Sequence, residues 1–226
     1  MTIPATPPPV PRPDPEQPAA SVPEGTVRAS VPLPVETSSG TVTARMLSFT
    51  GLHDGREHIA LVFGGALAAV PLVRVHSECL TGDVFGSGRC DCGPQLREAL
   101  DVLAGEGGVL LYLRQEGRGI GLYNKLDAYL LQDRGMDTFQ ANRELDFVDD
   151  LRDYRVAAQM LKGLGVASIR LLTNNPEKSR QLTDNGIAVD GIVGTGVFVR
   201  ESNTRYLQAK IRHAGHLIAL PVPARG

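Results

Sequence analysis

The sequence predicts a mixed α/β fold in which antiparallel strands come first and alternating strands and helices follow. Apolar residues alternate with polar residues between positions 26 and 75, whereas after position 92 they recur every three or four residues. Short apolar runs separate these later stretches. A period of two is typical of half-buried strands, and a spacing of three to four marks one face of a helix.

The first 25 residues differ in composition from the rest of the chain. Eleven of the sixteen prolines fall between Pro4 and Pro34, mixed with alanine, serine and glutamate. Such a segment buries too little apolar surface to offset the entropy of ordering it. We therefore predict a disordered proline-rich tail over residues 1–25 and a single folded domain over residues 26–220.

The first elements of this domain are predicted to be antiparallel strands. Apolar side chains alternate in the runs 27–33 and 59–63, with Gly and Asp turn signals between the runs. After residue 92 the period changes, because Leu96, Leu100 and Leu103 fall on one face of a helix.

The rest of the chain alternates between strand and helix. Apolar runs predict strands over residues 108–113 and 168–172, and helical spacing predicts helices over residues 122–130 and 156–164. Pro176 suits the first turn of a further helix. A last helix is predicted around residues 203–214.

Composition and charge exclude several classes of protein. The net charge is -2 at pH 7 and the pI is near 6.2, so no general positive field attracts a nucleic-acid backbone. No apolar run approaches the ~18 residues of a membrane-spanning helix, and the N-terminus lacks a signal-peptide pattern. We predict a cytoplasmic protein that has neither a nucleic acid nor a membrane as its partner.

Three cysteines form the strongest local signal. Cys79, Cys90 and Cys92 are spaced C-x10-C-x-C, and in a reducing cytosol such thiols are better explained as metal ligands or nucleophiles than as disulfides. A catalytic zinc uses three protein ligands and leaves a fourth position open, whereas a structural zinc is closed by four. Because the chain has no fourth cysteine, an open zinc site is favoured. Free core cysteines, or a structural zinc completed by His76 or another histidine, stay open as alternatives.

Two segments that follow predicted strands have the composition of phosphate-binding turns. Residues 115–121 read QEGRGIG, and Arg114 and Arg118 supply guanidinium groups that match phosphate oxygens. Residues 173–178 read TNNPEK, a proline-started helix with a lysine one turn in. Glycine-rich turns and capped helices are also common without a ligand, so each segment alone leaves both interpretations open.

Two polar runs carry further candidate residues. Residues 74–78 read RVHSE and lead into Cys79, which places a cation, an imidazole and a carboxylate beside the predicted metal. Residues 149–153 read DDLRD, and spacing alone favours a solvated loop there.

Taken in order, five motifs resemble the GTP cyclohydrolase II family. They are RVHSECLTGD (74–83), RCDCGPQL (89–96), RQEGRGIGL (114–122), LLTNNPEK (171–178) and GHLI (215–218). The resemblance covers residues 41–218, and five ordered motifs are far more specific than any one of them.

The resemblance implies an enzyme that opens the imidazole ring of GTP at the head of riboflavin biosynthesis. The implied products are a diaminopyrimidine ribosylamino phosphate, formate and pyrophosphate. Zinc is implied as the Lewis acid that activates water, and magnesium as an aid at the triphosphate. A homodimer is implied as well.

The resemblance also assigns roles to residues of this chain. Zinc is expected on Cys79, Cys90 and Cys92. GTP is expected on Arg74, Val75, His76, Ser77, Glu78, Gln95, Glu116, Gly117, Arg118, Thr138, Thr173 and Lys178. Asp150 matches the proton acceptor and Arg152 the proposed nucleophile, and Tyr129 is expected against the reacting base. A guanidinium stays protonated in proteins, so we expect Arg152 to stabilise charge in the transition state instead.

Residues 137–147 depart from the family pattern. The usual Asp-Thr-Val-Glu-Ala-Asn reads DTFQAN here, and the usual Leu-Gly-Phe reads LDF. Gln140 thus removes a carboxylate, Asp146 replaces a glycine, and Ala209 replaces a threonine before Lys210. These changes leave room for a paralogue whose product retains the formyl group. A non-catalytic GTP-binding module with structural zinc is the remaining alternative.

Overall fold

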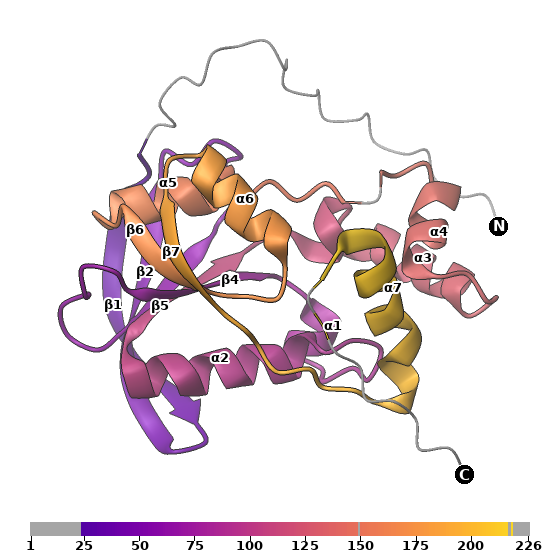
Figure 1. Cartoon of the computed structure of the whole chain (residues 1–226), viewed down its shortest axis with the longest axis horizontal. Coiled ribbons are helices and arrows are strands. Elements are labelled where there is room, and N and C mark those ends of the chain that lie inside the picture. The colour runs from indigo at the N-terminus through magenta and orange to yellow at the C-terminus, as the bar shows by residue number, and fades with distance from the viewer. Residues whose placement is uncertain (1–23, 149, 217, 219–226) are drawn as a thin grey trace.

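A computed structural model of the protein describes residues 24–148, 150–216 and 218. Most of the predicted disordered tail lies outside the described residues. Its last residue, Gly25, donates its backbone N–H to the carbonyl of Gln159 at 3.1 Å. The described chain has the mixed α/β fold that the sequence predicts (Figure 1).

Seven strands of the described chain form one mixed sheet in the order β1-β2-β3-β5-β4-β6-β7. Antiparallel pairs join β1, β2, β3 and β5, whereas β5, β4, β6 and β7 run parallel to one another. The structure therefore confirms the predicted change from antiparallel strands to alternating strands and helices. The strands are β1 (Thr26–Thr37), β2 (Gly40–Thr50), β3 (Ile59–Phe63), β4 (Leu72–Ser77), β5 (Gly108–Leu113), β6 (Ser168–Leu172) and β7 (Ala188–Val193).

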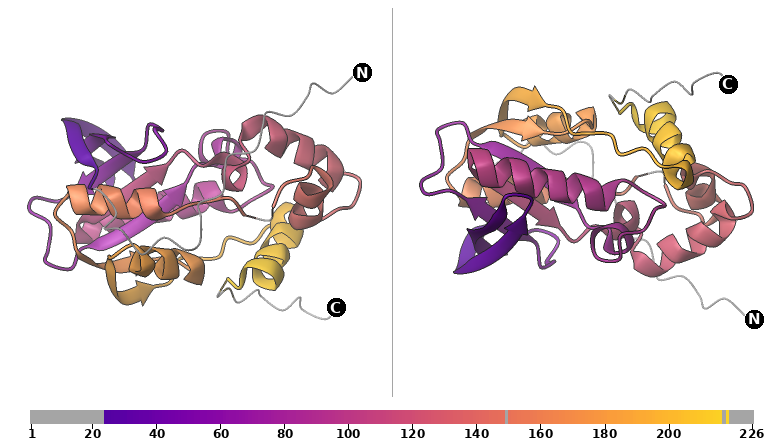
Figure 2. Two further views of the ribbon diagram at one scale, coloured as in Figure 1. Left: turned by 90° about the horizontal axis from the view of Figure 1, so that it is seen from above. Right: turned by 90° about the horizontal axis from the view of Figure 1, so that it is seen from below.

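Helices cover both faces of the sheet and one of its ends. The helix α2 packs on one face and α5 and α6 on the other, while α1, α3, α4 and α7 gather at one end of the molecule (Figures 1 and 2). No helix in the described ranges is both long and apolar enough to cross a membrane. The helices are α1 (Leu80–Asp83), α2 (Cys92–Glu106), α3 (Leu122–Gln132), α4 (Thr138–Glu144), α5 (Arg155–Gly163), α6 (Pro176–Asp184) and α7 (Thr204–Ala214), with short 3-10 turns η1 (Glu116–Gly119) and η2 (Glu201–Asn203).

The central parallel strands β4 and β5 are buried on both faces, as expected for strands covered by helices on each side. Val73 and Val75 of β4 belong to the core beneath α5 and α6. Leu72 of the same strand belongs to the core beneath α2, together with Leu103 and Leu110. The near-continuous apolar run in β5 follows from this double burial.

The parallel strands end at one edge of the sheet, and this edge positions the candidate site. The strand β4 leads into Cys79, β5 leads into η1, and β6 leads into the first turn of α6. Crevices at the carboxyl ends of parallel strands are the usual ligand sites of such sheets. The helices α1, α3, α4 and α7 lie beyond this edge (Figure 1).

The segment that departs from the family pattern contains a short helix, α4, that was not predicted from the sequence. The Asp137 carboxylate accepts hydrogen bonds from the backbone N–H groups of Phe139 and Gln140, and the Gln140 side chain accepts one from the N–H of Asp137. This reciprocal capping box starts α4, and glutamine serves in it as well as glutamate. The side chain of Gln140 is exposed, and its role here is to cap α4.

Candidate active site

One cavity at the carboxyl edge of the parallel strands brings most of the predicted site residues together. It holds about 1090 Å³ of space between protein atoms, including its open mouth. Val75 and Asp150 do not line it, although the Val75 carbonyl accepts a hydrogen bond from Lys178 Nζ at 2.7 Å. The predicted residues that do line it are Arg74, His76, Ser77, Glu78, Cys79, Cys90, Cys92, Gln95, Glu116, Gly117, Arg118, Tyr129, Thr138, Arg152, Thr173 and Lys178.

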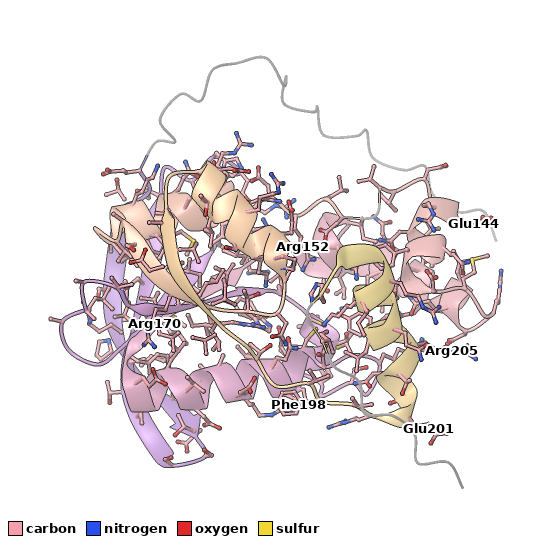
Figure 3. All side chains as sticks on the ribbon, in the orientation of Figure 1. Glu144, Arg152, Arg170, Phe198, Glu201 and Arg205 are labelled. Carbon is pink, nitrogen blue, oxygen red and sulfur yellow. The ribbon has the colours of Figure 1, made fainter. Side chains whose placement is uncertain are left out.

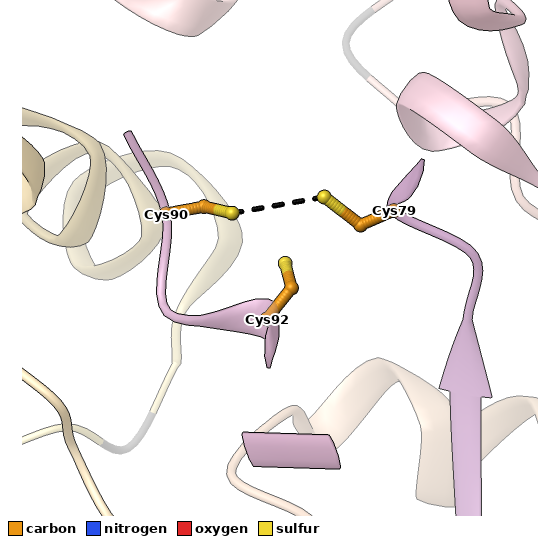
Figure 4. A group of neighbouring side chains, drawn as sticks. All are labelled: Cys79, Cys90 and Cys92. Carbon is orange, nitrogen blue, oxygen red and sulfur yellow. Dashed lines mark hydrogen bonds between the residues drawn. The ribbon is translucent and has the colours of Figure 1, made fainter. Parts of the chain in front are cut away.

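The three cysteines, which line this cavity, form a compact cluster (Figure 4). The sulfurs of Cys79 and Cys90 are 3.6 Å apart, and all three sulfurs lie within 4.8 Å of one another. Disulfide sulfurs would be about 2.05 Å apart. Four-coordinate zinc with Zn–S bonds of 2.3 Å separates its sulfurs by about 3.8 Å. The cluster therefore fits a tetrahedral metal better than a disulfide.

Two glycines make room for this cluster. A Cβ atom on Gly82 would lie 2.8 Å from the sulfur of Cys90 and 3.2 Å from that of Cys79. A Cβ atom on Gly93 would lie 2.3 Å from the carbonyl oxygen of Gly82. Side chains at these positions would push the two cysteine-bearing segments apart.

Histidine does not join the cluster. Among the described residues, the group of possible metal ligands contains only the three cysteines. His76 Nε2 instead lies 3.1 Å from a carboxylate oxygen of Asp83, and burial lowers the pKa of His76. Asp83 also accepts hydrogen bonds from the Cys79 backbone N–H and from the Tyr112 hydroxyl. His76 thus helps to position the start of the cysteine segment.

The electrostatic surroundings favour a thiolate at Cys79. Its pKa is lowered because the thiols of Cys90 and Cys92 hydrogen-bond to it and because Lys125 adds a nearby positive charge. Lys125 Nζ lies 3.2 Å from the Cys79 sulfur. The pKa of Cys90 is raised to about 11, because its thiol hydrogen-bonds to the Cys79 sulfur and because burial disfavours its ionised form. A divalent cation would allow all three sulfurs to be ionised.

A buried chain of hydrogen bonds links the cysteine segment to Arg74. Arg74 donates to the Gln95 side-chain oxygen at 3.1 Å, and Gln95 donates to Asp91 at 2.7 Å. Asp91 lies between two of the cysteines and is fully buried. Its second oxygen accepts from Lys210 of α7 at 2.7 Å. The helix α7 thereby contacts the cysteine segment directly.

Several cations also line the cavity. The pKa of Lys178 is lowered because burial disfavours its ammonium group and because Arg74, Arg152 and Lys210 repel it. The pKa of His216 is lowered to about 2 by burial and by lysine neighbours that include Lys210. Such crowding of positive charge costs free energy until an anion relieves it.

The glycine-rich turn after β5 presents Arg118 in a strained backbone conformation. Its φ angle is +61°, in the left-handed region that non-glycine residues rarely adopt. The guanidinium lies 4.2 Å from the centre of the Phe139 ring, which α4 supplies. Strain of this kind clusters at functional sites.

Arg152 turns inward from the polar run that the sequence alone places in a solvated loop. Only 14% of its side chain is exposed, and it lies between α6 and the end of the molecule that carries α7 (Figure 3). Both oxygens of Asp150 accept hydrogen bonds from its guanidinium. Burial opposes ionisation of Asp150, but these hydrogen bonds outweigh it and lower the Asp150 pKa.

Tyr129 of α3 connects the cavity to the cysteine segment. Its hydroxyl lies 3.2 Å from the Thr81 hydroxyl, which lies 3.7 Å from the Cys79 sulfur. The Arg89 guanidinium lies 4.7 Å from the centre of the Tyr129 ring. Thr81 therefore holds the hydroxyl of Tyr129, and Arg89 covers a face of its ring.

Several polar atoms of the cavity have no hydrogen-bond partner among the described residues. Thr195 follows β7, and its backbone pairs with the Asn174 side chain while its own hydroxyl is buried and unpaired. Unpaired buried polar atoms are rare in proteins and point to a ligand. The others that line the cavity are Arg74 Nε, His76 Nδ1, Ser77 Oγ, Gln115 Oε1 and Arg118 Nη1.

The sequence patterns missed part of this lining. Lys125 is the one missed residue that the sequence could have revealed, because it lies one turn before the predicted site residue Tyr129 on the predicted helix. Tyr206 and Lys210 come from α7. This helix lies far along the chain from the other lining residues, and nothing in its sequence indicates that it closes the cavity. Other lining residues that were not predicted include Arg89, Gln115, Asn142, Asn175, Thr195 and His216.

Comparisons with known proteins give a consistent result. A family profile described as GTP cyclohydrolase II matches residues 28–194. A Psychromonas ingrahamii protein named GTP cyclohydrolase-2 is 52% identical over 197 residues, which are 86% of this chain and 98% of that protein. The Bacillus subtilis riboflavin biosynthesis protein RibBA is 52% identical over 195 residues, covering 85% of this chain and 48% of that protein.

A solved structure gives a more distant match. It is RibBX, a two domain 3,4-dihydroxy-2-butanone 4-phosphate synthase from A. baumannii, with a TM-score of 0.40 and 21% identity. The match covers 75% of this chain and 40% of that one. This similarity is too low to support an inference about the present chain.

Proposed function

Because this chain belongs to the GTP cyclohydrolase II family and is an enzyme of riboflavin biosynthesis, we propose that it carries out the full zinc-dependent reaction on GTP. The products would be a diaminopyrimidine ribosylamino phosphate, formate and pyrophosphate. The family fixes the class of enzyme, and the cavity supplies the reasons to assign zinc, substrate and products.

One observation carries this proposal. A single cavity is lined both by three clustered thiols and by a group of cations, namely Arg74, Arg118, Arg152, Lys178 and Lys210. A nucleoside triphosphate needs both, because its base must meet the reactive group while its phosphates need positive charge. A structural zinc site would not need a cavity beside it.

We place ring opening at the cluster of thiols. Bound zinc would supply a Lewis acid that activates water at neutral pH. Cys79, Cys90 and Cys92 would hold it, and their shared opening toward the cavity leaves room for substrate. Tyr129 would lie against the base, with its hydroxyl fixed by Thr81 at 3.2 Å.

We place the triphosphate among the cations of the cavity, with magnesium as its expected companion. Arg152 would stabilise charge at the phosphorus, and Asp150 would hold its guanidinium in position. Ionised Asp150 is also in the form that accepts a proton. The lowered pKa of Lys178 supports an anionic ligand, since its cause is burial together with neighbouring cations.

Most departures from the family pattern lie outside the cavity lining, but the ring of Phe139, which stands where the family has valine, lies 4.2 Å from the guanidinium of the lining residue Arg118. Gln140 is exposed in the capping box of α4, and neither it nor Asp146 lines the cavity. The full reaction is therefore better supported than a product that retains the formyl group.

Three further assignments complete the proposal. We propose residues 26–220 as the catalytic domain and a homodimer as the assembly. Reduced thiols are required at the cluster, which favours the reducing cytoplasm as the site of action.

Product analysis tests the proposed reaction. The zinc-loaded protein is incubated with GTP and magnesium, and the products are identified by mass spectrometry. Free formate together with the diaminopyrimidine phosphate is the expected result. A retained formyl group would indicate the paralogue, and unchanged GTP would indicate a binding module.

Removing one thiol tests the metal assignment. Cys90→Ser should lose zinc and all ring opening, because two thiolates and a weaker hydroxyl ligand cannot replace the three-sulfur set. Zinc content is measured by elemental analysis and turnover by formate release. Full activity without bound zinc would overturn the catalytic-metal assignment.

A further inference from the structure

Lys125 extends a buried ammonium group from α3 to the cysteine cluster. Its side chain is only 12% exposed. An ammonium has three N–H donors, and Lys125 Nζ has three acceptors within reach: Glu116 Oε1 at 2.7 Å, Thr81 Oγ1 at 3.1 Å and Cys79 Sγ at 3.2 Å. Each donor thus has a partner, so the geometry is fixed rather than adaptable.

The three acceptors belong to three different parts of the candidate active site. Cys79 is a predicted metal ligand. The Thr81 hydroxyl continues to the Tyr129 hydroxyl, which is predicted to lie near the base. The Glu116 carboxylate accepts hydrogen bonds from the backbone N–H groups of Leu80 at 2.6 Å and Gly117 at 2.8 Å, and so ties the glycine-rich turn to the cysteine segment. Lys125 is where these three connections meet.

The charge at this position also matters for the metal. Three thiolates and one divalent cation sum to one negative charge, and Glu116 adds another in a half-enclosed space. A buried charge without a counter-charge is strongly destabilising. Within the described part of the chain, Lys125 is the cation that donates a hydrogen bond to one of the three sulfurs. A hydrogen bond to a ligand sulfur also alters how strongly that sulfur donates to the metal.

We propose that Lys125 is a positioning residue that sets the orientation and charge of the Cys79 ligand relative to Tyr129 and the 116–119 turn. The proposal rests on the metal assignment made under the proposed function. It differs from a purely structural ion pair with Glu116, because an ion pair alone would stabilise the fold without changing the properties of the metal.

The test compares three variants. Lys125→Met removes the charge at similar size, Lys125→Arg keeps the charge, and Lys162→Met is a matched control on α5, outside the cavity lining. Zinc affinity is measured by competition with a chelator. The visible spectrum of the cobalt-substituted protein reports the thiolate-to-metal bond directly.

Lys125→Met should bind zinc at least about tenfold more weakly, the usual minimum for a lost partner of a metal ligand. Its sulfur-to-cobalt charge-transfer band should move away from that of the wild type. Lys125→Arg should recover part of both properties, and Lys162→Met should match the wild type. Far-UV circular dichroism checks the fold, and Lys125→Gln takes the place of Lys125→Met if the latter does not fold.

Wild-type zinc affinity and an unchanged cobalt spectrum in folded Lys125→Met would overturn the proposal. A wild-type protein that binds neither metal would overturn it too. Failure of the proposed function is a separate result, because a wild type that binds zinc but does not convert GTP would leave the metal measurements on Lys125 valid.

Discussion

Asp146 occupies a backbone position that favours glycine. Its φ angle is +60°, just after α4. The Phe147 N–H donates to the Asn142 carbonyl and the Asp146 N–H to the Arg143 carbonyl, which is the Schellman pattern of a helix end. The left-handed backbone conformation thus explains why the family carries glycine at this position. Aspartate tolerates the left-handed region better than most residues but is still strained there.

Asp146→Gly should therefore increase the free energy of unfolding. Relief of the left-handed strain is worth about 1–2 kcal/mol, and the greater freedom of glycine in the unfolded chain removes about 0.5–1 kcal/mol of it. A net gain of roughly 0.5–1 kcal/mol should appear as a higher urea midpoint at constant slope. Asp146→Ala is the control and should not gain stability; equal midpoints for all three proteins would contradict this account.

Arg152 gives a second prediction, this one about catalysis. Arg152→Ala should lower pyrophosphate release at least about 100-fold, the usual effect of removing one group that stabilises transition-state charge. Pyrophosphate release and the melting temperature are measured together. The nearby Arg155, which pairs with Asp153 and does not line the cavity, provides the control variant Arg155→Ala. Normal pyrophosphate release by folded Arg152→Ala would remove Arg152 from the mechanism.

Individual site residues differ in how far the sequence reveals them. The cysteine spacing led directly to a compact cluster, because closely spaced ligands need little help from the fold. Arg152 was assigned by resemblance only, since nothing in the run DDLRD distinguishes a side chain that turns inward from one in solvent. Lys210 and Asp91 meet across more than a hundred positions of the chain, and no local pattern carries that information.

At the scale of elements, the loop between β2 and β3 is joined to the segment that carries Arg152. His53 Nε2 lies 3.3 Å from Asp153, and its Nδ1 lies 3.0 Å from the Gln159 side-chain oxygen. The hydrogen bond to Asp153 raises the His53 pKa against the effect of burial. Both ring nitrogens then have acceptors, as the protonated imidazole requires.

This contact predicts a pH-dependent contribution to stability. A folded-state pKa above the unfolded value of 6.5 stabilises the fold fully below that value, and the effect is lost as pH rises through the folded-state pKa. Asp153 stays ionised in this range because hydrogen bonds from His53 and Arg155 outweigh burial and lower its pKa. The stability difference between the wild type and His53→Gln should be larger at pH 5.5 than at pH 8.5. Urea titrations at both values measure it, and a difference that does not depend on pH would contradict the assignment.

In this chain, the spacing of apolar residues predicts where a helix lies better than it predicts which face of the helix is buried. The run around Leu126 and Leu130 correctly predicts α3, yet these side chains are 43% and 61% exposed. The opposite side of α3 carries Ala128 and Lys125, which line the cavity. The helix α4 was missed because its seven residues are too few and too polar to show a period.

At the scale of the whole molecule, the exposed face of α3 bears on the proposed homodimer. Tyr123 and Leu130 lie two turns apart and are 81% and 61% exposed, and Phe85 beyond α1 is 75% exposed. Large exposed apolar side chains that gather at one end of a protein are typical of interaction surfaces. This face is where we expect a second copy to pack.

Leu130→Lys should accordingly shift the protein from dimer toward monomer, because a buried ammonium without a partner disfavours the interface. Light scattering coupled to size-exclusion chromatography measures the mass. Ile192→Lys, an equally simple change at a 52% exposed residue of β7, is the control and should leave the mass unchanged. A monomeric wild type would show that the homodimer assignment is wrong.

The thiol cluster and the group of cations differ in how much of the chain must be in place before each exists. The three thiols all lie between residues 79 and 92, so only a short loop has to close to bring them together, at a small entropic cost. The cations are drawn from positions 74 to 210 and meet only when β4, β6 and α7 have all docked. Under the proposed function, the emerging chain can therefore capture zinc early in synthesis, whereas recognition of the triphosphate must wait for α7 to leave the ribosome.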